Sequence, residues 1–196
     1  MIALCGNPNS GKSTAQKILE ACGISPIDDG RPLRDVCKIM YGLTEAQVTT
    51  QAGKAEYVTV CGETYQVRDL LGTAGKLFEE RYSEQILPEA ALRIAEEHWA
   101  SLPAGHRQHG YSFGSVRKVQ GLTYRKHSRG VVMEIVRDGC APSPYDFDQY
   151  DRSYVSLTVR NPLPFGVEPD ENSVIAFRDE ILTAMAAIKL CTYSKD

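Results

Sequence analysis

Residues 2–14 read Ile-Ala-Leu-Cys-Gly-Asn-Pro-Asn-Ser-Gly-Lys-Ser-Thr, and this stretch decides the fold. Its apolar start predicts a short buried strand, and the residues from Lys12 onward begin the spacing of an amphipathic helix. Between strand and helix, Gly6 and Gly11 allow backbone N–H groups to turn inward around an anion. The first turn of the helix adds the positive end of its dipole. The stretch therefore predicts a strand–loop–helix unit that binds phosphate groups.

The spacing Gly6-x4-Gly11-Lys12-Ser13 matches the P-loop pattern. In that pattern the lysine contacts the outer phosphates of a nucleoside triphosphate, and the hydroxyl group that follows it binds Mg²⁺. We therefore expect ATP and Mg²⁺ as ligands, with Ser13 as a ligand of the metal. The expected ATP-binding residues are Gly6, Asn7, Asn9, Ser10, Gly11, Lys12, Ser13 and Thr14.

The composition is that of an ordinary globular chain. The 196 residues carry a net charge of −3, which argues against nucleic acid as a partner, because nucleic-acid-binding domains have a basic surface. No apolar run reaches the ~18 residues of a membrane span, and the apolar start is too short for a signal peptide. The six cysteines contain no Cys-x-x-Cys pair and are interpreted as reduced. We expect a cytoplasmic protein without membrane contact that binds small-molecule nucleotides, as a monomer or a homodimer.

Strands and helices alternate along the chain, which favours a three-layer α/β fold with a mainly parallel sheet. The expected strands of this sheet are residues 2–5, 24–27, 111–116, 131–136 and 154–159, and residues 57–61 and 64–67 are expected to form a hairpin. Helices are expected to follow the P-loop and Pro32, and over residues 68–82, 88–99 and 173–190. Thr44-x-x-Gln47 is a capping box that begins a further helix. The whole chain, residues 1–196, is expected to be one domain.

Three classes of protein fit the loop: a kinase, a GTPase switch, and a nucleotide-binding homologue without kinase activity. The string Gly-Asn-Pro-Asn-Ser-Gly-Lys-Ser-Thr is similar to the loop of Era- and FeoB-like GTPases. A GTPase also needs an Asp-x-x-Gly after a buried strand, but Asp69-Leu70-Leu71-Gly72 follows a segment that makes a poor buried strand. The Asn-Lys-x-Asp that reads guanine is missing, since Asn161 is followed by Pro162. The sequence therefore favours the kinase.

Short segments in the first half of the chain carry a further resemblance. In order they are the P-loop, Gly30-Arg31-Pro32-Leu33-Arg34, Gly42-Leu43-Thr44, Lys54, Gln66-Val67-Arg68-Asp69-Leu70-Leu71 and Gly75. This order resembles the bacteriophage-type deoxynucleoside monophosphate kinases over residues 1–85, and more weakly through Ser115-Val116-Arg117 and Ile135-Val136-Arg137. The resemblance implies transfer of a phosphoryl group from ATP to a nucleoside or deoxynucleoside monophosphate. The chain departs from the family at Ser115, where the family has an Asp.

The second expected strand ends at Asp28 and Asp29, at the edge of the sheet where α/β proteins bind their ligands. Asp28 is a candidate for holding Mg²⁺ through water, and both carboxylates are candidates for binding the acceptor. The alternative is a turn or a helix N-cap. His106-x-x-His109 lies between glycines without other metal ligands nearby and is interpreted as a loop.

The resemblance also implies which basic residues act. We expect Lys12, Arg68 and Arg137 to be catalytic. The acceptor-binding residues are expected to be Asp28, Asp29, Arg34, Arg68 and Arg117, within or beside an acceptor-binding insertion of about residues 30–100. A basic segment of about residues 117–130 is expected to form a lid over ATP, with Arg125 and Arg129 as its residues.

Overall fold

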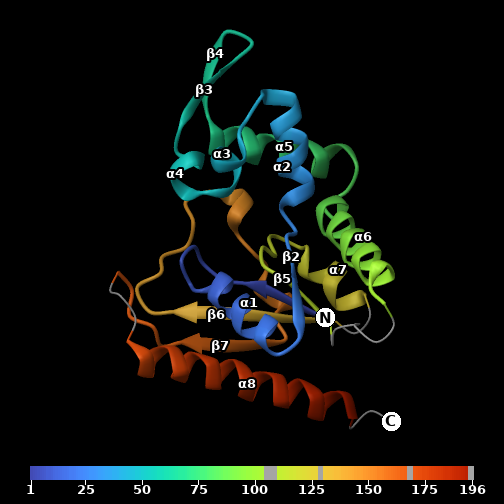
Figure 1. Ribbon diagram of the computed structural model, residues 1–196. Helices are drawn as coiled ribbons and strands as arrows, with labels where there is room; N and C mark the ends of the chain where they lie inside the picture. The colour runs from blue at the N-terminus through green and yellow to red at the C-terminus, as the bar shows by residue number, and fades with distance from the viewer. Residues whose placement is uncertain (104–109, 128–129, 167–169, 194–196) are drawn as a thin grey trace. The chain divides into compact units, whose positions relative to one another are not determined.

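The computed structural model describes residues 1–103, 110–127, 130–166 and 170–193, with side chains described as far as residue 188. The chain divides into two compact units (Figure 1). The first unit comprises Met1–Ile27 and Ile94–Asp196, and the second comprises Asp28–Arg93. The expected acceptor-binding insertion of about residues 30–100 falls largely within the second unit.

The first unit is built on a sheet of five parallel strands. They are β1 (Ile2–Cys5), β2 (Ile24–Ile27), β5 (Gly110–Phe113), β6 (Val131–Arg137) and β7 (Leu157–Asn161), and they lie in the order β2-β5-β1-β6-β7. All residues of β1 are buried, as expected for a central parallel strand that is covered on both faces. The predicted α/β class with a parallel sheet is therefore confirmed.

Helices cover both faces of this sheet. On one face, α1 (Lys12–Ala21) and α8 (Glu171–Tyr193) bury Leu19 and Phe177 against Leu4 and Met133 of the strands. In Figure 1, α8 runs beside β7. On the other face lies α7 (Gly121–Lys126), whose buried Tyr124 packs against Phe113 in a tilted arrangement with 4.7 Å between ring centroids. The sheet thus lies between two helical layers.

Two of the predicted strands differ from the observed strands by more than one residue at an end. The expected strand 154–159 is found at Leu157–Asn161, because Arg152–Tyr154 forms a 3₁₀ turn (η3) that Asp151 caps by accepting a hydrogen bond from Ser153 N. The expected strand 111–116 ends at Phe113. Val116 N nevertheless still donates to Leu4 O at 3.1 Å, which holds the segment after β5 beside the end of β1.

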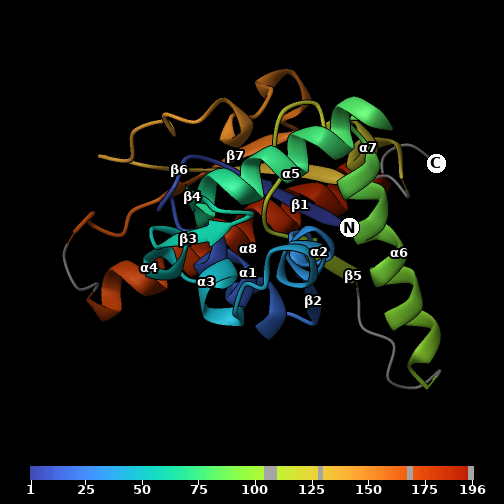
Figure 2. The same cartoon turned by 90° about the horizontal axis from the view of Figure 1, so that it is seen from above.

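The second unit combines helices with the predicted hairpin. Its elements are α2 (Arg31–Tyr41), α3 (Glu45–Thr49), α4 (Gln51–Lys54), β3 (Tyr57–Val60), β4 (Glu63–Gln66), α5 (Val67–Arg81) and the start of α6 (Ile86–Ser101). β3 and β4 pair antiparallel, and α5 follows β4 directly (Figure 2). The core of this unit is formed by Cys37, Leu43, Val48, Val67 and Ala74.

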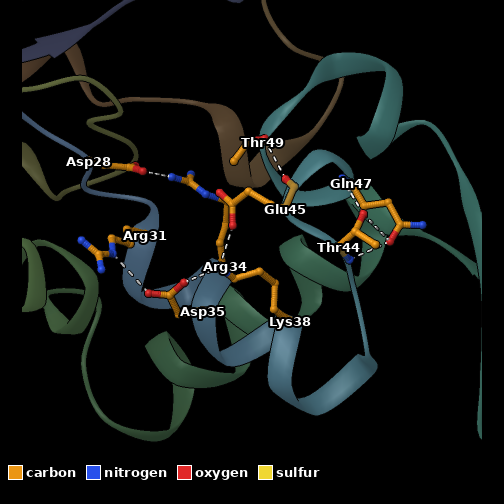
Figure 3. Close-up of polar contacts among 9 residues, drawn as sticks. All are labelled: Asp28, Arg31, Arg34, Asp35, Lys38, Thr44, Glu45, Gln47 and Thr49. Carbon is orange, nitrogen blue, oxygen red and sulfur yellow. Dashed lines mark hydrogen bonds and ion pairs between the residues drawn. The ribbon is translucent and has the colours of Figure 1, made fainter.

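The start of α3 confirms the predicted capping box. Thr44 Oγ1 accepts from Gln47 N, and Gln47 Oε1 accepts from Thr44 N at 2.9 Å (Figure 3). Among the described residues, no helix combines the length and the apolar character needed to cross a bilayer.

Candidate phosphate-binding site

The loop between β1 and α1 has the backbone shape that the glycines predicted. Three of its residues have positive φ: Gly6 at 140°, Asn9 at 62° and Gly11 at 103°. A Cβ atom on Gly6 would lie 2.4 Å from the backbone oxygen of Ile135, so only glycine fits there. The loop therefore folds tightly against the end of β6.

The loop delivers the start of α1 without a side-chain cap. Gly11 occupies the N-cap position, so the N-cap residue has no side chain that could accept from the first N–H groups of the helix. These N–H groups and the helix dipole are then available to an anion. Ser13, the expected Mg²⁺ ligand, is exposed in the first turn, and Thr14 follows it half-buried.

The side chain of Lys12 folds back over the loop. Its Nζ donates to Gly6 O at 2.8 Å and to Asn7 O at 2.9 Å. Burial lowers the pKa of Lys12, and the positive charge of Arg117 lowers it further. A cation that is partly desolvated and lies next to another cation is stabilised when an anion binds beside it. The electrostatics around Lys12 therefore favour a phosphate ligand.

A buried hydroxyl group completes the loop. Ser10 is 1% exposed, and its Oγ has no hydrogen-bond partner among the described residues. A Cβ on Gly6 would lie 2.8 Å from this Oγ, which places the hydroxyl under the loop. Buried polar groups are normally satisfied, so the hydroxyl of Ser10 indicates a place for a further polar group.

Three hydrogen bonds from side chains to backbone carbonyl groups fix the position of the loop. One is donated by a residue of the loop, and two are donated to the loop by residues outside it. Asn7 Nδ2 donates to Cys140 O at 2.9 Å. Arg137 Nη1 donates to Asn9 O at 3.1 Å, and Asn161 Nδ2 donates to Ser10 O at 2.8 Å. The segments at the ends of β6 and β7 thereby fix the conformation of the loop.

Arg137, for which a catalytic role is expected from the sequence, is occupied by backbone carbonyls. Besides Asn9 O, its guanidinium donates to Leu163 O at 2.7 Å and to Pro164 O, and it lies 5.5 Å from the ring centroid of Phe165. Three of its five N–H groups are therefore engaged. This is the geometry of a residue that positions loops, and a catalytic role for Arg137 stays a prediction.

Arg117 lies in the first unit, beside the loop lysine. Its Nη2 is 3.2 Å from Asp148 Oδ1, and Asp148 Oδ2 accepts from Ser143 Oγ at 3.0 Å. Asp148 belongs to the loop after β6, and its pairing with Arg117 could not be predicted from the sequence, because nothing in the string Tyr145–Tyr150 separates this carboxylate from its neighbours. The ion pair orients Arg117 and leaves a positive charge near Lys12.

The other expected acceptor-binding residues lie in the second unit. The guanidinium of Arg34, one turn into α2, contacts the carboxylate of Asp28 (Figure 3). Asp28 does not cap α2, because the N-cap residue is Gly30. Arg68, the second residue of α5, donates to Gln51 Oε1 at 2.6 Å. Asp28, Asp29, Arg34 and Arg68 therefore belong to one unit and Lys12 and Arg117 to the other, and their convergence stays a prediction.

The expected lid and metal residues are only partly described. Arg125 is exposed on α7, while Arg129, His106 and His109 lie outside the described residues. In the described part of the chain, no three acidic, histidine or cysteine side chains gather as a metal site. Ser115, where the sequence departs from the pattern that the first half resembles, follows the carboxyl end of β5.

A buried carboxylate network lies in β6, and sequence reasoning missed it. Glu134 is 3% exposed and accepts from Tyr150 and Thr158, while Arg152 forms an ion pair with it at 2.7 Å. Desolvation acts to raise the pKa of Glu134, but these hydrogen bonds outweigh it and hold the pKa below its ordinary value. The only signal was a glutamate inside an otherwise apolar run, Val131–Val136.

Two crystal structures of known proteins are similar to this chain. A shikimate kinase from Aquifex aeolicus VF5 is 17% identical, with 96% of this chain and 98% of that chain covered and a TM-score of 0.44. A gluconokinase from Sinorhizobium meliloti 1021 is 14% identical, with 100% and 97% covered and a TM-score of 0.44. No model of a protein family and no curated protein matches the chain. At such values the function has to be argued from the residues of this chain.

Proposed function

We propose that this protein is a kinase that uses ATP and Mg²⁺ to phosphorylate a nucleoside or deoxynucleoside monophosphate. The observation that carries the proposal is the loop: Gly6, Asn9 and Gly11 have positive φ, and the partly buried amine of Lys12 folds over them. The family resemblance of residues 1–85 supplies the choice of acceptor.

The residues of the loop fit a triphosphate. The uncapped start of α1 offers N–H donors, and the unpartnered hydroxyl of Ser10 offers another. Mg²⁺ would be held by Ser13 Oγ, and when bound it would neutralise phosphate charge. Oxygen ligands of this kind suit Mg²⁺, which keeps several of its waters.

The proposed step is an in-line transfer. A phosphate oxygen of the acceptor bonds to the γ-phosphorus of ATP while the bond to the β–γ bridging oxygen breaks, and ADP leaves with that electron pair. The protein contributes position and positive charge: Lys12 on the ATP side, and Arg34, Arg68 and Arg117 on the acceptor side. Guanidinium groups suit the second task, because they bind phosphate in a bidentate way.

The GTPase alternative loses its support in the structure. Asp69–Gly72 lies inside α5 instead of following a strand of the parallel sheet. Asn161, the residue nearest to a guanine-reading motif, is buried and bound to backbone groups. The homologue without kinase activity remains as the alternative that the experiment must exclude.

The test is ADP release from ATP and Mg²⁺ in the presence of each common nucleoside and deoxynucleoside monophosphate in turn. Lys12→Ala is the loss-of-function variant. Lys17→Ala is its matched control, since Lys17 is exposed on the same helix. We expect release to be stimulated by one or a few monophosphates, to vanish in Lys12→Ala and to persist in Lys17→Ala. Stimulation by no monophosphate would refute the choice of acceptor.

A further inference from the structure

Two neighbouring strands end in side chains that reach the same loop. Arg137 of β6 and Asn161 of β7 are register partners at the carboxyl ends of their strands. Arg137 donates to Asn9 O and Asn161 donates to Ser10 O, two successive carbonyl groups of the phosphate-binding loop. Because the sheet register places these two residues side by side, their side chains contact two successive residues of the loop.

Both polar atoms of the side-chain amide of Asn161 are hydrogen-bonded. The side chain is 2% exposed, Nδ2 donates to Ser10 O at 2.8 Å, and Oδ1 accepts from Leu163 N at 3.0 Å. A buried amide with both groups bonded has one orientation, since flipping it would place two acceptors and two donors against each other. The amide of Asn161 therefore turns its N–H donor, and not its oxygen, towards the carbonyl oxygen of Ser10.

The contact extends to the next residue of the loop. A Cβ atom on Gly11 would lie 2.2 Å from Asn161 Nδ2, so the amide occupies the space that any larger residue at position 11 would need. Gly11 also has φ 103°, a region that residues with a side chain rarely adopt. Asn161 and Gly11 are thus packed against each other at the point where the loop enters α1.

We infer that Asn161 is a positioning residue that sets the direction of the Ser10–Gly11 peptide for binding phosphate. In a planar trans peptide the C=O and the N–H point in opposite directions. Because Asn161 draws Ser10 O towards β7, the N–H of Gly11 is turned to the opposite side of the peptide, away from the side chain of Asn161. The inference deepens the proposed function and rests only on its nucleotide-binding part.

The test compares three variants by affinity for ATP with Mg²⁺, measured without acceptor, and by thermal unfolding. Asn161→Ala removes both hydrogen bonds, whereas Asn161→Asp keeps an acceptor for Leu163 N but turns a carboxylate oxygen towards Ser10 O. Val159→Ala is the control. It lies two residues earlier on the same face of β7 and is buried in the core.

We expect Asn161→Ala to weaken ATP binding about tenfold, the effect of losing one buried hydrogen bond. Asn161→Asp should weaken it more, since it adds repulsion at Ser10 O. Val159→Ala should lower the melting temperature and leave the affinity unchanged. AMP, which lacks the outer phosphates, should bind all four proteins alike if it binds. Wild-type affinity in Asn161→Asp would overturn the inference, as would an equal loss in Val159→Ala.

If the Asn161 variants do not fold, a measurement on the wild-type protein tests the positioning role of Asn161. In an isotope-labelled NMR spectrum, the side-chain N–H that points at Ser10 O should exchange slowly with solvent and shift when ATP and Mg²⁺ are added. Fast exchange without a shift would contradict the inference. Both measurements are made without acceptor, so failure of every monophosphate as a substrate would refute the proposed reaction and leave this result standing.

Discussion

The phenolic oxygen of Tyr150 lies 2.5 Å from Oε1 of Glu134, a carboxylate buried in the middle of the sheet. Arg152 donates to the same oxygen and Thr158 donates to the other one. The network ties the loop after β6 to β6 and β7. Because the same loop also carries Cys140 and Asp148, it supports Asn7 and Arg117 of the candidate site.

Replacing Glu134 by Gln should destabilise the protein by about 2 kcal/mol, since it removes the charge that three donors share. For a chain of this length that is a fall in melting temperature of roughly 4–8 °C. Arg152→Ala should also lower the melting temperature, because it leaves the buried carboxylate of Glu134 without its cation. An unchanged melting temperature in both variants would contradict this account of the network.

The same network predicts a pH dependence. The pKa of Glu134 is lower in the folded protein than its ordinary value of 4.5. Its contribution to stability is therefore present above the unfolded-state pKa, and it is lost as the pH falls through the folded-state pKa. Unfolding measured from neutral to acid pH should show a smaller acid loss in Glu134→Gln than in the wild type. If the stability of both proteins fell equally with decreasing pH, carboxylates other than Glu134 would cause the loss of stability in acid.

Gly6→Ala should weaken ATP binding by at least about tenfold, because the new methyl group would meet the backbone oxygen of Ile135. Gly42→Ala provides the control, since Gly42 also has positive φ, 68°, but a Cβ atom there would meet nothing within 4 Å. Its expected effect is a loss of stability of about 1 kcal/mol with unchanged affinity. Equal affinities for both variants would show that the fit of the loop against β6 does not matter.

Arg34→Ala should raise the KM for the acceptor by about tenfold or more, as expected when a charge-assisted hydrogen bond to phosphate is lost. Arg31→Ala is the matched control on the same helix, because its guanidinium is exposed and pairs with Asp35 at 3.3 Å (Figure 3). The KM for ATP should stay the same in both variants. An acceptor KM that rises equally in both would assign the effect to net charge.

The cysteines should differ widely in reactivity towards a thiol reagent. Cys61 is exposed at the turn of the β3–β4 hairpin. Burial raises the pKa of Cys5 to about 12 and that of Cys37 to about 11, so both thiols should react only on unfolding. Cys61→Ser should remove the fastest phase of labelling. Labelling of Cys5 in that phase would contradict the burial of β1.

Local patterns could be predicted from the sequence, and contacts between distant segments could not. The P-loop, the hairpin and the Thr44–Gln47 capping box each depend on residues within about a dozen positions of one another, so their spacing reveals them. The bond from Asn161 to Ser10 joins residues 151 positions apart. Its existence depends on the β6–β7 register, which no short motif encodes.

Asn161 and Arg137 show how such contacts change the interpretation of a residue. In the sequence, Asn161 enters only as an asparagine that does not begin a guanine-reading motif, and Arg137 enters through the resemblance of Ile135-Val136-Arg137 to the kinase family. In the structure both side chains are bound to backbone carbonyls of the loop. Whether an arginine meets phosphate or carbonyl oxygen is decided by tertiary packing, and that is why its role could not be predicted from spacing.

The most direct test of the central claim follows the phosphoryl group itself. ATP labelled in its γ-phosphate is incubated with Mg²⁺, the protein and each monophosphate, and the products are separated. We predict label in a nucleoside diphosphate for the wild type and for Lys17→Ala, and none for Lys12→Ala. Label found only in inorganic phosphate, or retained in ATP with every acceptor, would contradict the assignment as a nucleoside monophosphate kinase.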